Sequence, residues 1–188
     1  MTLRRLSSVY RMAALLCLLS LLGCATTHPV QKSSLPGVDN FSLIEAGDTF
    51  AGSPVGFGGA TSPEALQALS SAGFATVISL RQADEEGMEL ERSRQAAETL
   101  GIRYLSLPLN PGTANAATLT EILDAMEESG NQPLYLHCGS GTRAAAVWMI
   151  GRVQRDGLSQ ESAEAEARVI AGKPERAVIL ARKFLESR

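Results

Sequence analysis

The chain has 188 residues, of which 45% are hydrophobic and 20% charged, and its 17 basic and 20 acidic residues give a formal net charge of −3. This balance is typical of a packed globular protein, and it excludes a disordered chain, a collagen-like repeat and a strongly basic nucleic-acid-binding protein. Three cysteines cannot form the framework of a disulfide-rich scaffold in so long a chain, and 5% aromatic residues offer little for base stacking. We therefore expect one globular domain and no nucleic-acid partner.

Residues 1–23 have the pattern of an export signal. Three arginines precede an apolar run over residues 12–22, and that run is shorter than the ~20 residues that a membrane-spanning helix needs. The following Leu21-Leu22-Gly23-Cys24 resembles the lipobox of bacterial lipoproteins. The resemblance implies a cleaved signal peptide over 1–23, lipidation of Cys24, and an outer-membrane anchor facing the periplasm, because the residue after the cysteine is not acidic.

Loss of the signal changes the charge and the cysteine count. It removes three arginines and no acidic residue, so the mature chain has a net charge of −6 and no general attraction for nucleic acid or anionic lipid. Cys17 leaves with the signal and Cys24 carries the lipid, so Cys138 is the only free thiol. A solitary thiol in an oxidising compartment is a hazard unless it is buried or used.

The mature chain is predicted to be a tether followed by one domain. Residues 24–40 are rich in Thr, Ser and Pro without an apolar period, which predicts a flexible tether. The domain is expected over residues 41–188, where apolar runs alternate with helical stretches. Buried strands are predicted at 74–80, 102–107 and 133–137, and helices at 62–73, 85–100, 117–129, 143–156, 160–171 and 174–187. This alternation predicts a single α/β domain with a mainly parallel central sheet flanked by helices.

The segment from His137 to Arg143 joins the last predicted strand to the next helix. Its glycines and small side chains let successive backbone N–H groups point inward, and the helix N-terminus adds partial positive charge. These donors stabilise the thiolate of a cysteine at the start of the loop, and Arg143 is suited to hold an oxyanion through two parallel hydrogen bonds. A buried Cys or a strand-end His alone is usually structural. Their order here favours an anion-binding loop with Cys138 as the nucleophile and His137 fixing the loop geometry.

This loop, the strand over 73–81 with Glu85 just beyond it, the segment 101–108 and the apolar helix 144–153 together resemble the cysteine-dependent tyrosine and dual-specificity phosphatases. The most similar group is the small bacterial phosphatase-like family that is also found fused to β-lactamase-like hydrolases, and the resemblance covers roughly residues 48–172. It implies a phosphocysteine intermediate on Cys138, formed from a phosphorylated protein or small molecule, and needs no metal or other cofactor. Arg143 then binds phosphate and stabilises the transferring phosphoryl group. The other expected substrate-binding residues are Gly139, Ser140, Gly141, Thr142 and His137. Arg81 follows a buried strand toward the same sheet edge, so it is expected either to line the pocket and bind substrate or to form a surface ion pair.

Three departures from this pattern concern the chemistry. Four residues separate Cys138 from Arg143, where most of the superfamily has five, and Ala144 stands where a Ser or Thr assists breakdown of the intermediate. The stretch 110–118 contains no carboxylate to serve as general acid. We assign the acid role to Asp84, Glu85 or water, although these acidic residues alternatively form a solvated helix start. Slow turnover, or substrates with good leaving groups, is expected.

A rhodanese-type sulfurtransferase, carrying a persulfide on Cys138, is the main alternative because many rhodaneses have this four-residue spacing. The strand 77–81 lacks the rhodanese Asp, however, and no strand is predicted after Cys138. A weakly active anion-binding module is a third interpretation, which the presence of both Cys138 and Arg143 disfavours.

Overall fold

A computed structural model describes residues 27–186 of the chain, so the predicted signal peptide and Cys24 lie outside the described residues. The sheet order is β1-β2-β3-β6-β4-β5. β3, β6, β4 and β5 are parallel, whereas β1 and β2 are antiparallel to their neighbours. The strands are β1 (Gln31–Lys32), β2 (Ser42–Ile44), β3 (Val55–Gly58), β4 (Thr76–Ser79), β5 (Arg103–Ser106) and β6 (Leu134–His137).

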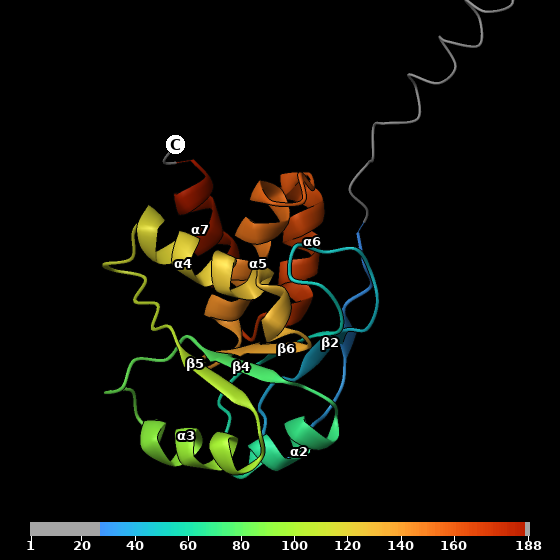
Figure 1. The fold of residues 1–188 in the computed structure, drawn as a ribbon. Coiled ribbons are helices and arrows are strands. Elements are labelled where there is room, and N and C mark those ends of the chain that lie inside the picture. The colour runs from blue at the N-terminus through green and yellow to red at the C-terminus, as the bar shows by residue number, and fades with distance from the viewer. Residues whose placement is uncertain (1–26, 187–188) are drawn as a thin grey trace, which may run out of the picture.

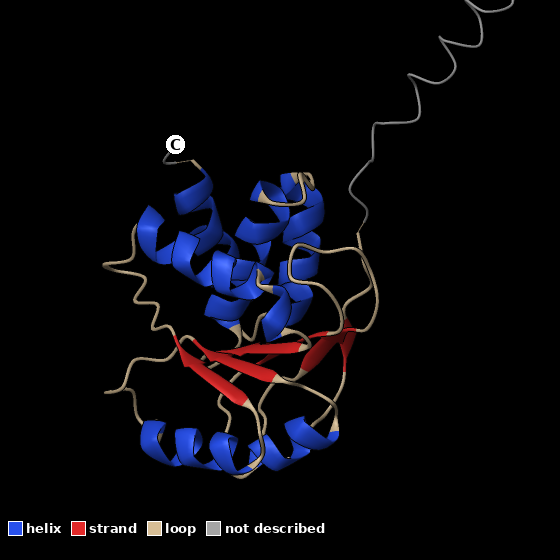
Figure 2. Ribbon diagram, viewed as in Figure 1, coloured by secondary structure: helices blue, strands red, loops and turns tan. Residues whose placement is uncertain are grey.

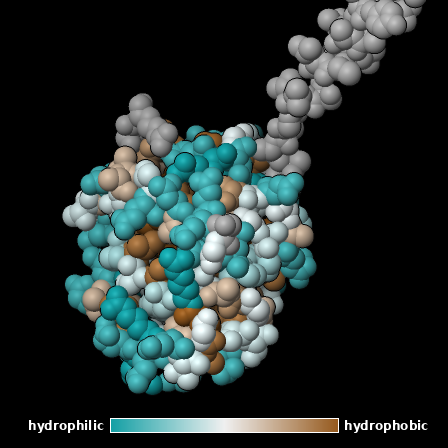
Figure 3. Space-filling model, viewed as in Figure 1, coloured by the Kyte–Doolittle hydropathy of each residue, from teal (hydrophilic) through white to brown (hydrophobic). Residues whose placement is uncertain are grey.

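Helices cover both faces of this sheet (Figures 1 and 2). α2 (Ala65–Ser71) and α3 (Leu90–Thr99) lie on one face, and α4 (Ala116–Glu127), α5 (Thr142–Gln154), α6 (Gln160–Ile170) and α7 (Pro174–Leu185) on the other. No helix among residues 27–186 is both long and apolar enough to cross a membrane. The face drawn in Figure 3 is mostly hydrophilic, with hydrophobic residues in small separate patches. The predicted α/β domain with a mainly parallel sheet is confirmed.

The central strand positions the predicted loop. All four residues of β6 are buried, as expected for a parallel strand covered on both faces. Leu136 and Cys138 belong to the core cluster that includes α5, whereas Tyr135 belongs to the cluster on the other face, because successive strand residues point to opposite faces. α5 is buried from Ala144 to Arg152, so it is a central helix rather than an amphipathic surface helix. The loop between β6 and α5 is therefore held at both ends by the core.

Local sequence signals located most elements within a few residues, with two corrections. The helix expected from Glu85 begins at Leu90, and residues 82–89 form a loop instead. The Glu86 and Gly87 carbonyl oxygens accept hydrogen bonds from the Arg81 side chain rather than from the backbone of a helix. The antiparallel strands β1 and β2 and the parallel β3 were not separately predicted.

The described part of the predicted tether is not free. β1 pairs with β2, and Val38 forms an isolated bridge with Thr61. Partly buried Leu35 and Val38 pack on the smaller core cluster. The prediction of a flexible tether is therefore wrong for residues 31–40, because pairing with the sheet edge and burial of these apolar side chains offset the loss of chain entropy.

Candidate active site

The predicted loop follows the carboxyl end of β6. His137 is in register with Gly58 of β3 and Ser79 of β4, so the segments that follow all three strands begin at one edge of the sheet. The Cys138 N–H donates to the Gly58 carbonyl oxygen at 3.3 Å, and Ser140 forms a bridge with Gly59. Substrate sites in open α/β folds form at this edge.

The loop enters α5 through a left-handed residue. Gly141 has φ +77°, and a Cβ there would lie 2.6 Å from the Asn40 Nδ2 atom, so both the backbone angle and the space require glycine. α5 begins immediately afterwards, and the Ala145 N–H donates to the Gly141 carbonyl at 2.9 Å. The first N–H groups of a helix have no acceptor within it, and they favour an anion. Thr142 and Arg143 stand in that first turn.

Arg143 is held along one side only. Its Nη1 donates to Glu85 Oε1 at 2.6 Å and to the carbonyl oxygens of Leu80 and Leu109 at 2.9 and 3.2 Å, and its Nη2 donates to Glu85 Oε2 at 2.7 Å. A guanidinium has five N–H donors. Among the described residues, the edge formed by Nε and the second Nη2 hydrogen donates no hydrogen bond to an oxygen, and the guanidinium also interacts with the Cys138 side chain. That edge is available for an oxyanion beside the sulfur.

Glu85 is the ion-pair partner that fixes Arg143, and it is not a suitable general acid. Its carboxylate accepts hydrogen bonds from both Nη atoms of Arg143, from the Gln82 N–H at 2.8 Å and from Arg81 Nε at 3.4 Å. Partial burial raises the pKa of Glu85, but these hydrogen bonds and the charge of Arg143 outweigh it and lower the pKa to about 2. A carboxyl group with that pKa is ionised at neutral pH, which argues against the acid role expected for Glu85.

The ion pair with Glu85 also changes the pKa of Arg143. Burial lowers the pKa of Arg143, but its hydrogen bonds with Glu85 and its interactions with Cys138 outweigh burial and leave the pKa raised. Arg143 therefore stays charged throughout any reaction at this site.

Arg81 supports the loop that carries Glu85. It is buried, and its Nη1 and Nη2 atoms donate to the Gly87 and Glu86 carbonyl oxygens at 3.2 and 2.5 Å. These bonds replace the helix predicted from residue 85 with a loop that turns the Glu85 carboxylate toward Arg143. Arg81 thus acts on the site through Glu85 and is not a surface ion pair, whereas Asp84 is exposed.

His137 is a buried neutral residue behind the loop. Its Nδ1 atom lies 3.3 Å from the Gly59 carbonyl oxygen, its ring stacks on Tyr135, and its Nε2 atom has no partner among the described residues. Burial, followed by the charges of Arg81 and Arg143, lowers its pKa to about 4. His137 therefore contacts the Gly59 carbonyl in the segment after β3 and interacts with the Cys138 backbone at the start of the loop.

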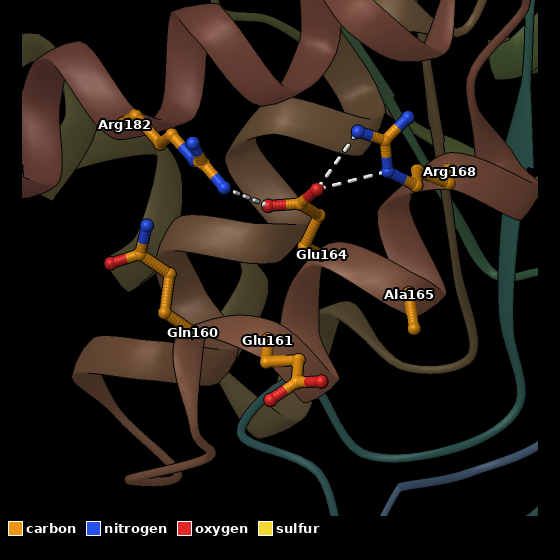
Figure 4. A pocket seen from close by; sticks show the side chains of 6 residues that line it. All are labelled: Gln160, Glu161, Glu164, Ala165, Arg168 and Arg182. Atoms are coloured by element: carbon orange, nitrogen blue, oxygen red, sulfur yellow. Dashed lines mark hydrogen bonds and ion pairs between the residues drawn. The ribbon is translucent and has the colours of Figure 1, made fainter.

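The sulfur of Cys138 lies deep in the site, with the residue only 1% exposed. A nearby cavity of about 330 Å³ opens at the same sheet edge and is lined by Arg81, Thr61 and Asp39, but not by Cys138. The cavity in Figure 4 lies on α6 and α7, where Glu164 is bound by Arg168 and Arg182, and it shares no residue with the loop. Cys138 is thus almost fully buried and lines neither of these two cavities.

Within residues 27–186, no group of three His, Cys, Asp or Glu side chains is placed to hold a metal ion. The positive character at the loop comes from Arg143 and from the helix N-terminus.

Two residues near the loop were not identified from the sequence. Asn40 Nδ2 donates to the carbonyl oxygens of Ile170 and Ser140, at 2.7 and 3.4 Å, and the Gly172 N–H donates to the same Ser140 oxygen at 3.0 Å. Asn40 belongs to the predicted tether, and Gly172 follows the helix predicted over 160–171. The one local signal for Asn40 is its position immediately before the first apolar residues of the domain.

Comparison with known proteins supports the fold and identifies the family. The structure is similar to that of TpbA from P. aeruginosa in complex with pTyr, with a TM-score of 0.60 and 18% identity over 84% of this chain and 88% of that chain. It is also similar to the core catalytic domain of the PP-IP phosphatase SIW14 from S. cerevisiae in complex with citrate, with a TM-score of 0.62 and 17% identity over 82% of this chain and 91% of that chain.

A segment of 93 residues is 31% identical to the Oryza sativa subsp. japonica protein named "Probable NAD kinase 2, chloroplastic", but the chain spans only 10% of that protein. Residues 37–155, more than half of the chain, match the family described as "Beta-lactamase hydrolase-like protein, phosphatase-like domain". The chain therefore belongs to this family of phosphatase-like domains.

Proposed function

We propose that this protein is a cysteine-dependent phosphatase of the tyrosine or dual-specificity type, acting on phosphomonoesters. The observation that carries the proposal is the arrangement of Arg143 in the first turn of α5: its guanidinium interacts with Cys138 and is bound by Glu85, while its Nε donates no hydrogen bond among the described residues. A planar edge with two N–H groups matches two oxygens of a phosphoryl group. The similarity to proteins with phosphatase names and to a complex with pTyr supports this substrate class.

The proposed reaction has two displacements. The Cys138 thiolate attacks phosphorus, a sulfur–phosphorus bond forms, and the bond from phosphorus to the leaving oxygen breaks. Water then attacks the phosphocysteine and releases inorganic phosphate, regenerating the thiolate. Arg143 and the first-turn N–H groups stabilise charge on the phosphoryl oxygens in both steps. Because Glu85 is ionised, the leaving oxygen takes its proton from water, which favours aryl esters with stable leaving groups.

The test uses an aryl phosphate and the purified full-length protein. The native protein should release phosphate, and rapid acid quenching should show one phosphoryl group on the peptide that contains Cys138. Cys138→Ser should abolish both signals, whereas Glu86→Gln, a change of an exposed side chain, should preserve them. Equal phosphate release by the native protein and the Cys138→Ser variant would refute the proposal.

We further propose that Cys24 is lipidated and that the domain is exported. The lipobox-like sequence 21–24 motivates this proposal. The His28 N–H donates to Glu166 Oε1 at 3.1 Å, so His28 is attached to α6. The chain from Cys24 to His28, four residues further on, spans at most ~14 Å. Cys24→Ala should leave the protein out of the membrane fraction, whereas membrane retention of a processed variant would contradict lipidation.

A further inference from the structure

The carbonyl group of Ser140, in the middle of the phosphate-binding loop, is held by two segments outside that loop. The Gly172 N–H, in the turn between α6 and α7, donates to this oxygen at 3.0 Å. Asn40 Nδ2 lies 3.4 Å from it and also donates to the Ile170 carbonyl oxygen at 2.7 Å. The side-chain amide thus ties the loop to the carboxyl end of α6 across sequence separations of 100 and 130 residues.

These contacts fix the orientation of one peptide group. A trans peptide is planar, so the Ser140 oxygen and the Gly141 N–H lie on opposite sides of it. With the oxygen held against Asn40 and Gly172, the N–H is fixed on the side away from them. A reversed peptide would turn the negative end of its dipole toward that side, next to the N-terminus of α5, where an anion requires positive character. Glycine at position 141 makes such a reversal easy unless something prevents it.

Asn40, Gly141 and Gly172 pack closely around the Ser140 carbonyl group. Asn40 has φ +52°, a left-handed conformation that Asn adopts more readily than most other residues. A Cβ at position 172 would lie 2.3 Å from the Ser140 oxygen, and a Cβ at position 141 would lie 2.6 Å from Asn40 Nδ2. Glycines are therefore required at both positions for the approach of these groups.

The segment that carries Asn40 is anchored independently of the loop. The Asp39 N–H donates to the Ala60 carbonyl at 2.9 Å, and the Asp39 carbonyl accepts from the Gly59 N–H at 2.6 Å. The Lys32 ammonium donates to Asn40 Oδ1, the amide atom that does not take part in the two Nδ2 contacts. In Figure 1 the segment, drawn in blue, runs beside β2 at the edge of the sheet.

We propose that Asn40 and Gly172 are positioning residues, which hold the Ser140 carbonyl outward and thereby keep the loop in its anion-binding conformation. The inference rests on the proposed function, because it assigns these residues to the same loop. It goes beyond that function by making the segment before the domain core part of the site.

The test for Asn40 separates its side chain from its backbone conformation. Asn40→Gly keeps the left-handed backbone and removes the amide, and Asn40→Asp replaces the N–H donor by an oxygen that faces two carbonyl oxygens. Lys32→Met is the matched control, because it removes the hydrogen bond on the other side of the same side chain and leaves both Nδ2 contacts in place. The readout is protection of Cys138 from iodoacetamide by inorganic phosphate, measured by mass spectrometry of the Cys138 peptide.

Loss of one aligned donor to an anion corresponds to roughly a tenfold to hundredfold change in affinity. Asn40→Gly and Asn40→Asp should weaken phosphate protection by that factor and raise the KM for an aryl phosphate, while Lys32→Met changes both by less than about threefold. A purely structural role would lower the unfolding temperature without changing phosphate affinity in the folded protein. Affinity within about twofold of the native value in Asn40→Gly would overturn the proposal.

A substitution at Gly172 independently tests the role of the peptide group between Ser140 and Gly141. Gly172→Ala places a methyl group against the Ser140 oxygen and should weaken phosphate protection to a similar extent. Gly130→Ala is the matched control, since a Cβ there meets no atom closer than 3.8 Å. A normal phosphate affinity in Gly172→Ala would contradict the inference. Phosphate protection without turnover in the native protein would refute the proposed phosphatase reaction alone, whereas absence of protection in the native protein would refute both.

Discussion

Replacing Glu85 by glutamine tests how the site holds its arginine. Glu85→Gln keeps the size of the side chain and an oxygen for the Gln82 N–H, but it removes the charge that binds Arg143 and Arg81. The pKa of Glu85 falls from 4.5 to about 2 in the folded protein. At about 1.4 kcal/mol for each unit, this corresponds to roughly 3 kcal/mol, and the exposure of 22% of the Glu85 side chain reduces the expected loss of unfolding free energy to about 2 kcal/mol.

The sign of the pH dependence follows from the lowered pKa. The folded state favours the ionised carboxylate, so the stabilisation is fully present above about pH 4.5 and is lost as the pH falls toward about 2. Urea unfolding near pH 7 should show the full difference between the native protein and Glu85→Gln, and unfolding near pH 2.5 should show a much smaller one. A difference that does not shrink with acid would contradict the ion-pair explanation.

The same variant distinguishes a positioning role from acid catalysis. If Glu85 only orients Arg143, kcat/KM should fall by a similar factor, roughly tenfold to a hundredfold, for all aryl phosphates. A general acid matters most for poor leaving groups, so its loss would lower kcat/KM progressively more as the leaving-group pKa rises. A steep dependence of this kind would restore the acid role to Glu85. Glu86→Gln serves as the control, because that side chain is exposed.

Three further predictions concern single residues. Arg143→Lys retains the charge but loses the planar pair of N–H groups, so aryl phosphate kcat/KM should fall by about a hundredfold or more, and retention of activity would contradict bidentate binding. His137 has a pKa lowered to about 4 by burial, so the native protein should lose stability as the pH falls from about 6.5 to 4, and His137→Gln should flatten that dependence of unfolding free energy. Glu166→Gln removes one of the two carboxylate charges that bind the buried Arg152, the other being Asp156, and weakens the bond from Trp148. Denaturant unfolding should therefore show a loss of about 2 kcal/mol, and a loss below ~1 kcal/mol would be inconsistent with a stabilising buried ion pair.

Residues with strong local patterns were predicted well. The strand at 74–80 and the helices at 160–171 and 174–187 appear within a few residues of their expected bounds, because their apolar spacing and end signals lie in the elements themselves. The loop at 137–143 was located for the same reason, since a strand, two glycines and a helix start follow one another along the chain. β1 has only two residues and no local pattern, so its pairing with β2 could not be predicted.

The sequence by itself determined the α/β class, the position of Cys138 and Arg143 around a glycine-containing loop, and the family resemblance. The tertiary structure alone decided what acts on that loop. Glu85 binds Arg143 across 58 positions, and Asn40 approaches Ser140 across 100. These contacts form because the packed core brings distant strand ends and turns together. No pattern in the residues next to Arg143 or Ser140 indicates which distant segment will lie beside them. For this reason the ion pair between Glu85 and Arg143, and the contact of Asn40 with the loop, became visible only in the structure.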